Sequence, residues 1–143
     1  KKLENMDEDF NEEIRNELGE KDPDVKIVAV QADKESRSGA SENPQTIDGI
    51  APFGDEGFPD ALKAPFIVGF DYDECIDVKG EDAYAAGREI ARTDGVFLGQ
   101  SAGAAIYAAT QLAKRPENAG KNIVAILADN GMKYLSTNMY KAD

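Results

Sequence analysis

The stretch Phe97-Leu98-Gly99-Gln100-Ser101-Ala102-Gly103-Ala104-Ala105 joins an apolar run to an alanine-rich run through a turn of small residues. The apolar residues before Gly99 predict a short strand, and the alanines after Ser101 predict a helix that extends to about Lys114. The small side chains would allow this helix to lie close against a neighbour. A strand that leads into a helix in this way is typical of α/β proteins.

Outside this turn, predicted strands and helices alternate along the chain. Residues 24–30 and 122–127 are predicted strands, and their nearly continuous apolar runs are typical of parallel strands covered on both faces. Weaker strand signals lie at 64–70 and 74–78, and residues 82–93 have helical spacing. The alternation predicts an α/β fold with a mostly parallel sheet and flanking helices.

The first 22 residues form a strongly charged block that differs from the rest of the chain. An apolar residue recurs every third or fourth position from Leu3 to Leu18, which predicts an acidic amphipathic helix over 2–18. A length of 143 residues predicts a single domain over 1–143, in which the block 1–22 precedes the α/β part at 23–143.

The composition excludes several classes of function. The chain has 28 acidic and 16 basic residues, a formal net charge of −12, and no histidine. Such a surplus of acid argues against binding to nucleic acid or to an anionic membrane. Without histidine, the chain has no Ser-His-Asp triad, no Cys-His dyad and no His-bearing zinc site. No apolar run reaches about 18 residues and no leader pattern is visible, so we expect a cytoplasmic protein.

Two further features are expected to be structural. Cys75 has acidic neighbours, which disfavour the thiolate, so a packed thiol is expected rather than a nucleophile. Four carboxylates cluster around it, at Asp71, Asp73, Glu74 and Asp77. Their spacing is not that of a calcium-binding loop, so we expect a solvated acidic face and no metal site.

Ser101 allows three interpretations. Gly99 to Gly103 matches the G-x-S-x-G turn of the α/β-hydrolases, but the histidine base is missing. Serine is also a good N-cap, which would make its role purely structural. Finally, the first turn of a helix offers free N–H groups and a positive dipole end, so Ser101 could contact a cofactor.

The chain resembles, most specifically in its C-terminal third, the pyridoxal-phosphate-dependent cysteine synthases (O-acetylserine sulfhydrylases) and their cystathionine β-synthase relatives. The resemblance extends over about 22–140 and rests on five strings: LAKRPENAGK (112–121), DNGMKYLST (129–137), GQSAGAA (99–105), PDVKIVAV (23–30) and IDGI (47–50). It implies part of the large domain of the tryptophan-synthase-β-like fold, also called fold type II. Only the C-terminal half of such a protein would be present.

The resemblance also implies a cofactor, pyridoxal 5′-phosphate, and residues that contact it. In the family, the serine at the position of Ser101 hydrogen-bonds the pyridine nitrogen, and a neutral hydroxyl suits β-elimination and β-replacement. Gly99 and Gly49 would lie near the cofactor. The family's cofactor-binding lysine and its phosphate-binding loop are not found in this sequence. We therefore assign no catalytic residue and expect no complete reaction from this chain alone.

Two functions follow as alternatives. The first is the C-terminal portion of an enzyme that replaces the O-linked group of an O-acetylserine-like amino acid with sulfide. Its implied partners are the amino-acid substrate, a second copy or a complementing N-terminal half, and serine acetyltransferase. The second is a non-catalytic truncated paralogue that acts as a folded binding module.

Overall fold

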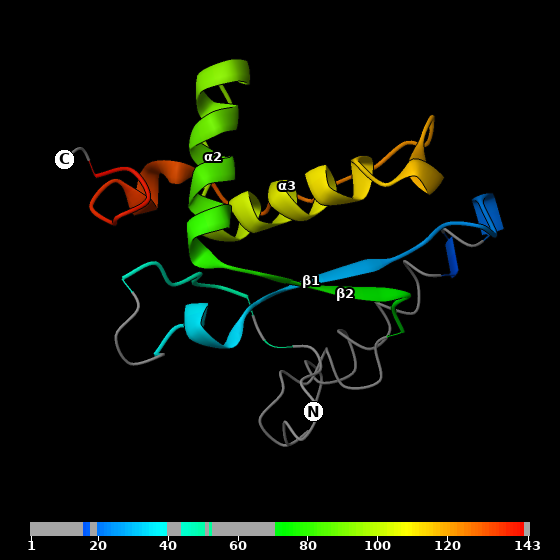
Figure 1. Cartoon of the computed structure of the whole chain (residues 1–143), viewed down its shortest axis with the longest axis horizontal. Coiled ribbons are helices and arrows are strands. Elements are labelled where there is room, and N and C mark those ends of the chain that lie inside the picture. Colours follow the sequence, from blue (N-terminus) through cyan, green and yellow to red (C-terminus); the bar gives the residue numbers. More distant parts are fainter. Residues whose placement is uncertain (1–15, 18–19, 40–43, 51, 53–70, 142–143) are drawn as a thin grey trace. The chain divides into compact units, whose positions relative to one another are not determined.

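The computed structural model describes residues 16–17, 20–39, 44–50, 52 and 71–141 (Figure 1). Its longer elements are strands β1 (Val28–Ala32) and β2 (Glu74–Val78) and helices α2 (Gly80–Asp94) and α3 (Gln100–Ala113). Three short 3-10 turns accompany them: η1 (Lys34–Ser36), η3 (Pro116–Asn118) and η4 (Gly131–Tyr134). The strand predicted at 64–70 lies outside the described residues, as does the helix predicted over 2–18 except for 16 and 17, which are helical.

The contacts divide the chain into two compact units. One unit contains Lys1–Ala29 and Ala51–Cys75, and the other contains Val30–Ile50 and Ile76–Asp143. The second unit holds α2, α3 and every residue of the candidate site. The single-domain organisation over 1–143 stays a prediction.

β1 and β2 pair as a parallel two-stranded sheet. The Asp73 N–H donates to the Ile27 carbonyl at 2.8 Å, and the Asp33 N–H donates to the Val78 carbonyl at 3.0 Å. Because the pairs follow the same order along both segments, the two strands run in the same direction. The predicted α/β class with a parallel sheet is thus confirmed.

The strand bounds match the sequence for β2 but not for β1. β2 covers the predicted 74–78, whereas β1 begins at Val28, four residues after the predicted start at 24. The earlier residues form a turn, in which the Val25 N–H donates to the Asp22 carbonyl at 3.1 Å. The Ile27 N–H then donates to the carboxylate of Asp73 at 2.7 Å rather than to a strand carbonyl. Local polar contacts therefore replace the start of the predicted strand.

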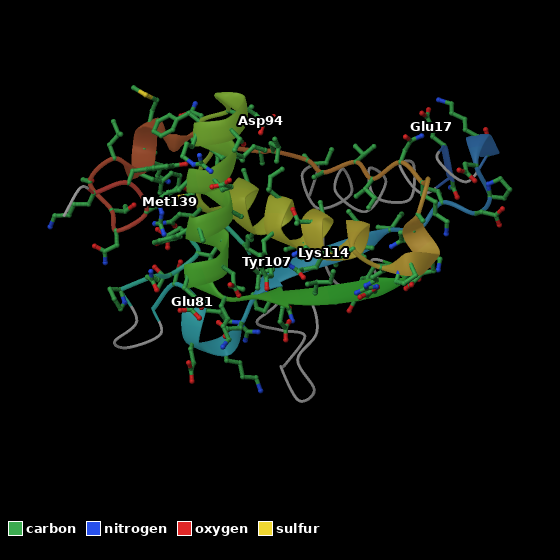
Figure 2. All side chains as sticks on the ribbon, turned by 45° about the horizontal axis from the view of Figure 1, so that its top comes forward. Glu17, Glu81, Asp94, Tyr107, Lys114 and Met139 are labelled. Carbon is green, nitrogen blue, oxygen red and sulfur yellow. The ribbon has the colours of Figure 1, made fainter. Side chains whose placement is uncertain are left out.

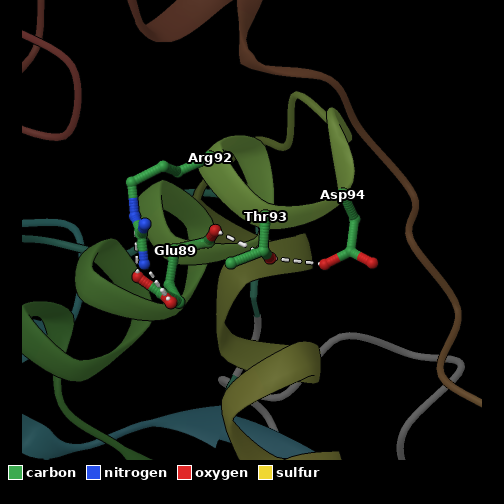
Figure 3. Close-up of polar contacts among 4 residues, drawn as sticks. All are labelled: Glu89, Arg92, Thr93 and Asp94. Carbon is green, nitrogen blue, oxygen red and sulfur yellow. Dashed lines mark hydrogen bonds and ion pairs between the residues drawn. The ribbon is translucent and has the colours of Figure 1, made fainter.

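α2 ends in a cluster of exposed polar contacts (Figure 3). The Arg92 guanidinium donates to the Glu89 carboxylate at 2.6 Å, and the Thr93 hydroxyl donates to the Glu89 carbonyl at 3.1 Å and also contacts Asp94. The next residue, Gly95, has a φ of +72°, the left-handed conformation that commonly ends a helix. Exposed ion pairs contribute little stability, so the end of α2 is fixed mainly by Gly95.

α2 and α3 cross at close range (Figure 1). Gly103 of α3 lies against the Ala83 carbonyl of α2, where a Cβ would overlap backbone atoms. Met139 packs from the C-terminal segment beside α2, and Tyr107 of α3 packs against the same core (Figure 2). The fully buried members of this core are Ala32, Ile47, Val78, Ala83, Tyr84, Ala104, Ala108 and Met139. Within the described ranges, no helix has the length and apolar character needed to cross a membrane.

The prediction of a buried strand at 122–127 is wrong, because these residues are not in a strand in this structure. The residues from 121 to 129 form no strand, and Val124 and Ile126 are 84% and 77% exposed. Likewise, the apolar run at 95–98 forms only an isolated bridge between Leu98 and Asn130. A strand requires a neighbour that supplies ladder hydrogen bonds, and no such neighbour of 122–127 lies among the described residues.

Candidate functional site

Ser101 is the second residue of α3, and its side chain is half-buried. The N-cap of the helix is Gly99, two positions earlier than a capping role for Ser101 requires, and it makes no side-chain cap hydrogen bond. The interpretation of Ser101 as the N-cap is therefore wrong. Its hydroxyl lies in the first helical turn, where its partners come from outside the helix.

The carboxylate of Asp129 occupies the end of α3. Its Oδ1 accepts a hydrogen bond from Ser101 Oγ at 3.0 Å and another from the Ala102 N–H at 3.3 Å. The Gly99 N–H also donates to the backbone carbonyl of Asp129, at 3.2 Å. Asp129 thus caps the helix from a distant segment, and its negative charge lies at the positive end of the helix dipole.

The absence of a side chain at Gly99 makes this arrangement possible. A Cβ on Gly99 would overlap the Asp129 carboxylate. The backbone at Gly99 is extended, with φ of −81° and ψ of −178°, so the glycine is required for space rather than for backbone conformation. The small residue in the predicted turn therefore has a specific steric role.

Tyr134 also interacts with the carboxylate of Asp129. Burial raises the pKa of Tyr134 to about 12, with a further contribution from its hydrogen bond with Asp129. The phenol is a hydrogen-bond donor at neutral pH and stays protonated to higher pH than an ordinary tyrosine. Asp129 is therefore approached by donors from Ser101, Ala102 and Tyr134.

Gln100 connects the turn around Gly49 to the start of α3. Its side chain is only 2% exposed, and its Oε1 accepts from the Asp48 N–H at 2.9 Å. Its Nε2 donates to the Tyr84 hydroxyl at 2.8 Å, which in turn donates to the Thr46 carbonyl at 2.7 Å. Gly49 follows Asp48 in this turn with a φ of +83°.

The three predicted cofactor-contacting residues are therefore connected in one unit. Gly99 and Ser101 flank Gln100 in sequence, and Gln100 binds the residue next to Gly49. Sequence reasoning identified neither Gln100 nor Asp129 as a site residue. The sequence marks Gln100 only as a polar side chain within a run of small and apolar residues, and Asp129 only as the first residue of the string 129–137 that resembles the family.

The other candidate features have structural partners. Asp77 accepts a hydrogen bond from Gln31 Nε2 at 2.6 Å, and Asp73 binds the Ile27 N–H, so both carboxylates join the paired strands. Cys75 is half-buried on β2. For Ser101, the partner is a carboxylate, and the chain contains no histidine that could act as the base of a serine hydrolase.

Comparison with known proteins identifies the family. Residues 14–129 match the family model of pyridoxal-phosphate-dependent enzymes. A cysteine synthase from Staphylococcus aureus is 36% identical over 123 residues, which cover 85% of this chain and 36% of that protein. The chain therefore spans about a third of this relative's length.

Solved structures give the same result. A cysteine synthase from Entamoeba histolytica superposes with a TM-score of 0.67 at 39% identity, over 91% of this chain and 36% of that one. An O-acetylserine-dependent cystathionine β-synthase from Helicobacter pylori gives a TM-score of 0.64 at 30% identity, over 88% and 38%. The fold is thus that of the fold type II enzymes, whose cofactor is pyridoxal phosphate. The chain belongs to the pyridoxal-phosphate-dependent enzyme family and is a cysteine-synthase-like member that covers a fragment of the full fold.

Proposed function

We propose that this chain supplies part of the active site of an enzyme that replaces the O-linked group of O-acetylserine, or of a similar O-activated serine, with sulfide. Pyridoxal phosphate supplies the electron sink for such β-replacement when it is bound. The observation that carries the proposal is the half-buried Ser101 hydroxyl in the first turn of α3, with the Gly49 turn connected to the same turn through Gln100.

The donor set around Asp129 fits a role of Ser101 toward a ring nitrogen. In this structure the Ser101 hydroxyl donates its proton to Asp129. If the hydroxyl turned its proton to an unprotonated ring nitrogen, Asp129 would keep hydrogen bonds from the Ala102 N–H and from Tyr134. The carboxylate would therefore not be left without a partner, which would be costly in a partly buried position.

The glycines contribute space in this proposal. The Asp129 carboxylate takes the place of a Cβ on Gly99, whereas a Cβ on Gly49 would meet no atom within 4 Å, so a flat ring can approach the backbone at Gly49. Gln100 and Tyr84 hold the two backbone segments at a fixed separation through hydrogen bonds of 2.8–2.9 Å. Gly99, Ser101 and Gly49 thus hold the ring in place, and we assign the chemical steps to no residue of this chain.

The partners of the proposed enzyme follow from the family. The chain covers 36% of its cysteine synthase relative, so the lysine and phosphate-binding loop of the family would come from further polypeptide of the same fold. We propose an amino-acid substrate, assembly with a complementing N-terminal part or a second copy, and serine acetyltransferase as a family partner. A cytoplasmic location is part of the same proposal.

A non-catalytic binding module is the second candidate. The small share of the relatives' length and the exposed apolar residues at 123–127 favour it, because both are compatible with a fragment that binds another protein.

The two candidates differ in their absorbance with pyridoxal phosphate. We would mix the cofactor with the chain alone and with the chain co-produced with the complementing part of a cysteine synthase. A visible band of bound cofactor that requires both parts supports the enzyme, and a complex without a band supports the binding module.

Ser101→Ala tests the assigned contact. In the complex with the complementing part of a cysteine synthase, loss of one hydrogen bond of about 1.4 kcal/mol should lower turnover about tenfold without loss of fold. Thr110→Ala is the matched control, because Thr110 is an exposed hydroxyl of the same helix that donates only to the Ile106 carbonyl at 2.8 Å. Equal turnover of both variants would contradict the role of Ser101.

A further inference from the structure

The hydroxyl of Ser101 has one proton, and Asp129 accepts it. Ser101 Oγ lies 3.0 Å from Oδ1 of Asp129 and donates to it. A hydroxyl can donate to one acceptor at a time, although it can accept hydrogen bonds from other groups. Any second acceptor that comes to Ser101 must therefore compete with Asp129 for this proton.

Asp129 is also held in place by groups other than Ser101. The same Oδ1 accepts from the Ala102 N–H at 3.3 Å, and Tyr134 hydrogen-bonds the carboxylate as well. The backbone carbonyl of Asp129 accepts from the Gly99 N–H at 3.2 Å. Because these bonds come from the backbone and from a second side chain, the carboxylate stays beside Ser101 when the proton of Ser101 moves to another acceptor.

The charge of Asp129 makes it a strong acceptor. Within the described part of the chain, no basic side chain forms an ion pair with this carboxylate. Arg88 of α2 donates to a backbone carbonyl of the C-terminal segment at 3.0 Å, and the amino group of Lys133 lies 5.7 Å from the ring centre of Tyr134. A hydrogen bond to a charged acceptor is about twice as strong as one between neutral groups, so breaking the bond from Ser101 to Asp129 has a cost.

We propose that Asp129 is a positioning residue that competes with the ring nitrogen of pyridoxal phosphate for the proton of Ser101, and so lowers the affinity of the site for this cofactor. The inference rests on the proposed function, in which Ser101 contacts that nitrogen. Binding of the cofactor exchanges a hydrogen bond to a charged acceptor for one to a neutral ring nitrogen. The charge of Asp129 should therefore weaken cofactor binding about tenfold, which corresponds to about 1.4 kcal/mol.

The test is Asp129→Asn in the full chain, co-produced with the part of the Staphylococcus aureus cysteine synthase outside the matched 123 residues. The Oδ1 of asparagine can still accept from Ser101 and from the Ala102 N–H, but it carries no charge. Ser101 can therefore turn its proton to the ring nitrogen at a lower cost. We expect the variant complex to bind pyridoxal phosphate about tenfold more tightly than the wild-type complex, measured by titration of the visible band of the bound cofactor, with an unchanged circular dichroism spectrum.

Three controls separate competition for the proton from a general effect of charge, because pyridoxal phosphate is itself an anion. An analogue with a C–H group in place of the ring nitrogen cannot accept the proton, so Asp129→Asn should leave the affinity for this analogue unchanged. In the Ser101→Ala background, Asp129→Asn should likewise leave cofactor affinity unchanged. Asp94→Asn removes the same charge from the exposed end of α2, and this variant should bind the cofactor as tightly as the wild type does.

The outcomes separate this inference from the proposed function. Tighter binding that requires both the ring nitrogen and Ser101 would support the competition. Equal or weaker binding by Asp129→Asn would overturn it, and so would a gain in affinity that persists with the analogue or in the Ser101→Ala background, because that gain would come from charge alone. A cofactor band is present in each of these cases, so the proposed function is not contradicted. No band in the wild-type complex would contradict the proposed function and, with it, the inference.

Discussion

Replacement of Gly99 by alanine should uncouple Asp129 from the start of α3. The new Cβ would overlap the carboxylate and displace it from Ser101 Oγ and the Ala102 N–H. Two partly buried hydrogen bonds to a charged acceptor contribute about 1.5 kcal/mol each at the lower end of the usual range. Alanine fits the extended backbone at Gly99 and gains about 0.4–1 kcal/mol by restricting the unfolded chain. The net loss is therefore about 2 kcal/mol in the free energy of unfolding, measured by urea titration.

A double-mutant cycle with Asp129→Ala identifies the cause of this loss. Asp129→Ala alone should also cost about 2 kcal/mol, because it removes the same cap and leaves Ser101 and Ala102 without their acceptor. In that background the overlap no longer exists, so Gly99→Ala should be neutral or slightly stabilising. The expected coupling is about 2 kcal/mol. An equal cost of Gly99→Ala in both backgrounds would refute the assignment of Asp129 as the cap of α3.

Three further predictions concern neighbouring positions. Burial raises the pKa of Tyr134 to about 12 from an ordinary 10.0, so its contribution to the free energy of unfolding is complete below pH 10 and is lost as the pH rises through 12. Tyr134→Phe should therefore reduce the fall in the free energy of unfolding over this pH range by up to about 2–3 kcal/mol. An unchanged slope of this free energy against pH would contradict the prediction. Gln100→Leu should increase the hydrogen-exchange rate of the Asp48 amide at least tenfold more than that of α2 amides, since only the former loses its acceptor. Gly95→Ala should cost about 1 kcal/mol by thermal unfolding because of its φ of +72°, and a stabilised variant would show that another residue ends α2.

Local patterns in the sequence are sufficient to predict α2, α3 and β2. The bounds of α2 and α3 lie within two residues of the predicted ones, because both depend on spacing and small residues within the segment itself. The residues at 122–127 show the limit of this reasoning. Their apolar pattern is that of a strand, but pairing depends on neighbours elsewhere in the polypeptide, so the pattern cannot show whether a neighbour is present.

The site was predictable to the same extent. Ser101 and Gly99 lie in the short turn at 99–103, and Gly49 lies in the string IDGI at 47–50. Local sequence is therefore enough to identify them. Asp129 and Gln100 act across 28 and 52 positions of sequence, through hydrogen bonds with Ser101 and Asp48. Such contacts are set by tertiary packing and leave no spacing that could be recognised from a single sequence.

The hydrogen bonds of the candidate site and the strand predicted at 122–127 differ in what they require of the rest of the fold. The hydrogen bonds among Ser101, Asp129, Gln100 and the Gly49 turn all lie within one compact unit, so they do not depend on further strands. The apolar residues at 123–127, in contrast, are exposed and lack backbone partners among the described residues. The geometry around Ser101 should therefore form within this unit alone, whereas a strand at 122–127 requires a neighbour that supplies ladder hydrogen bonds.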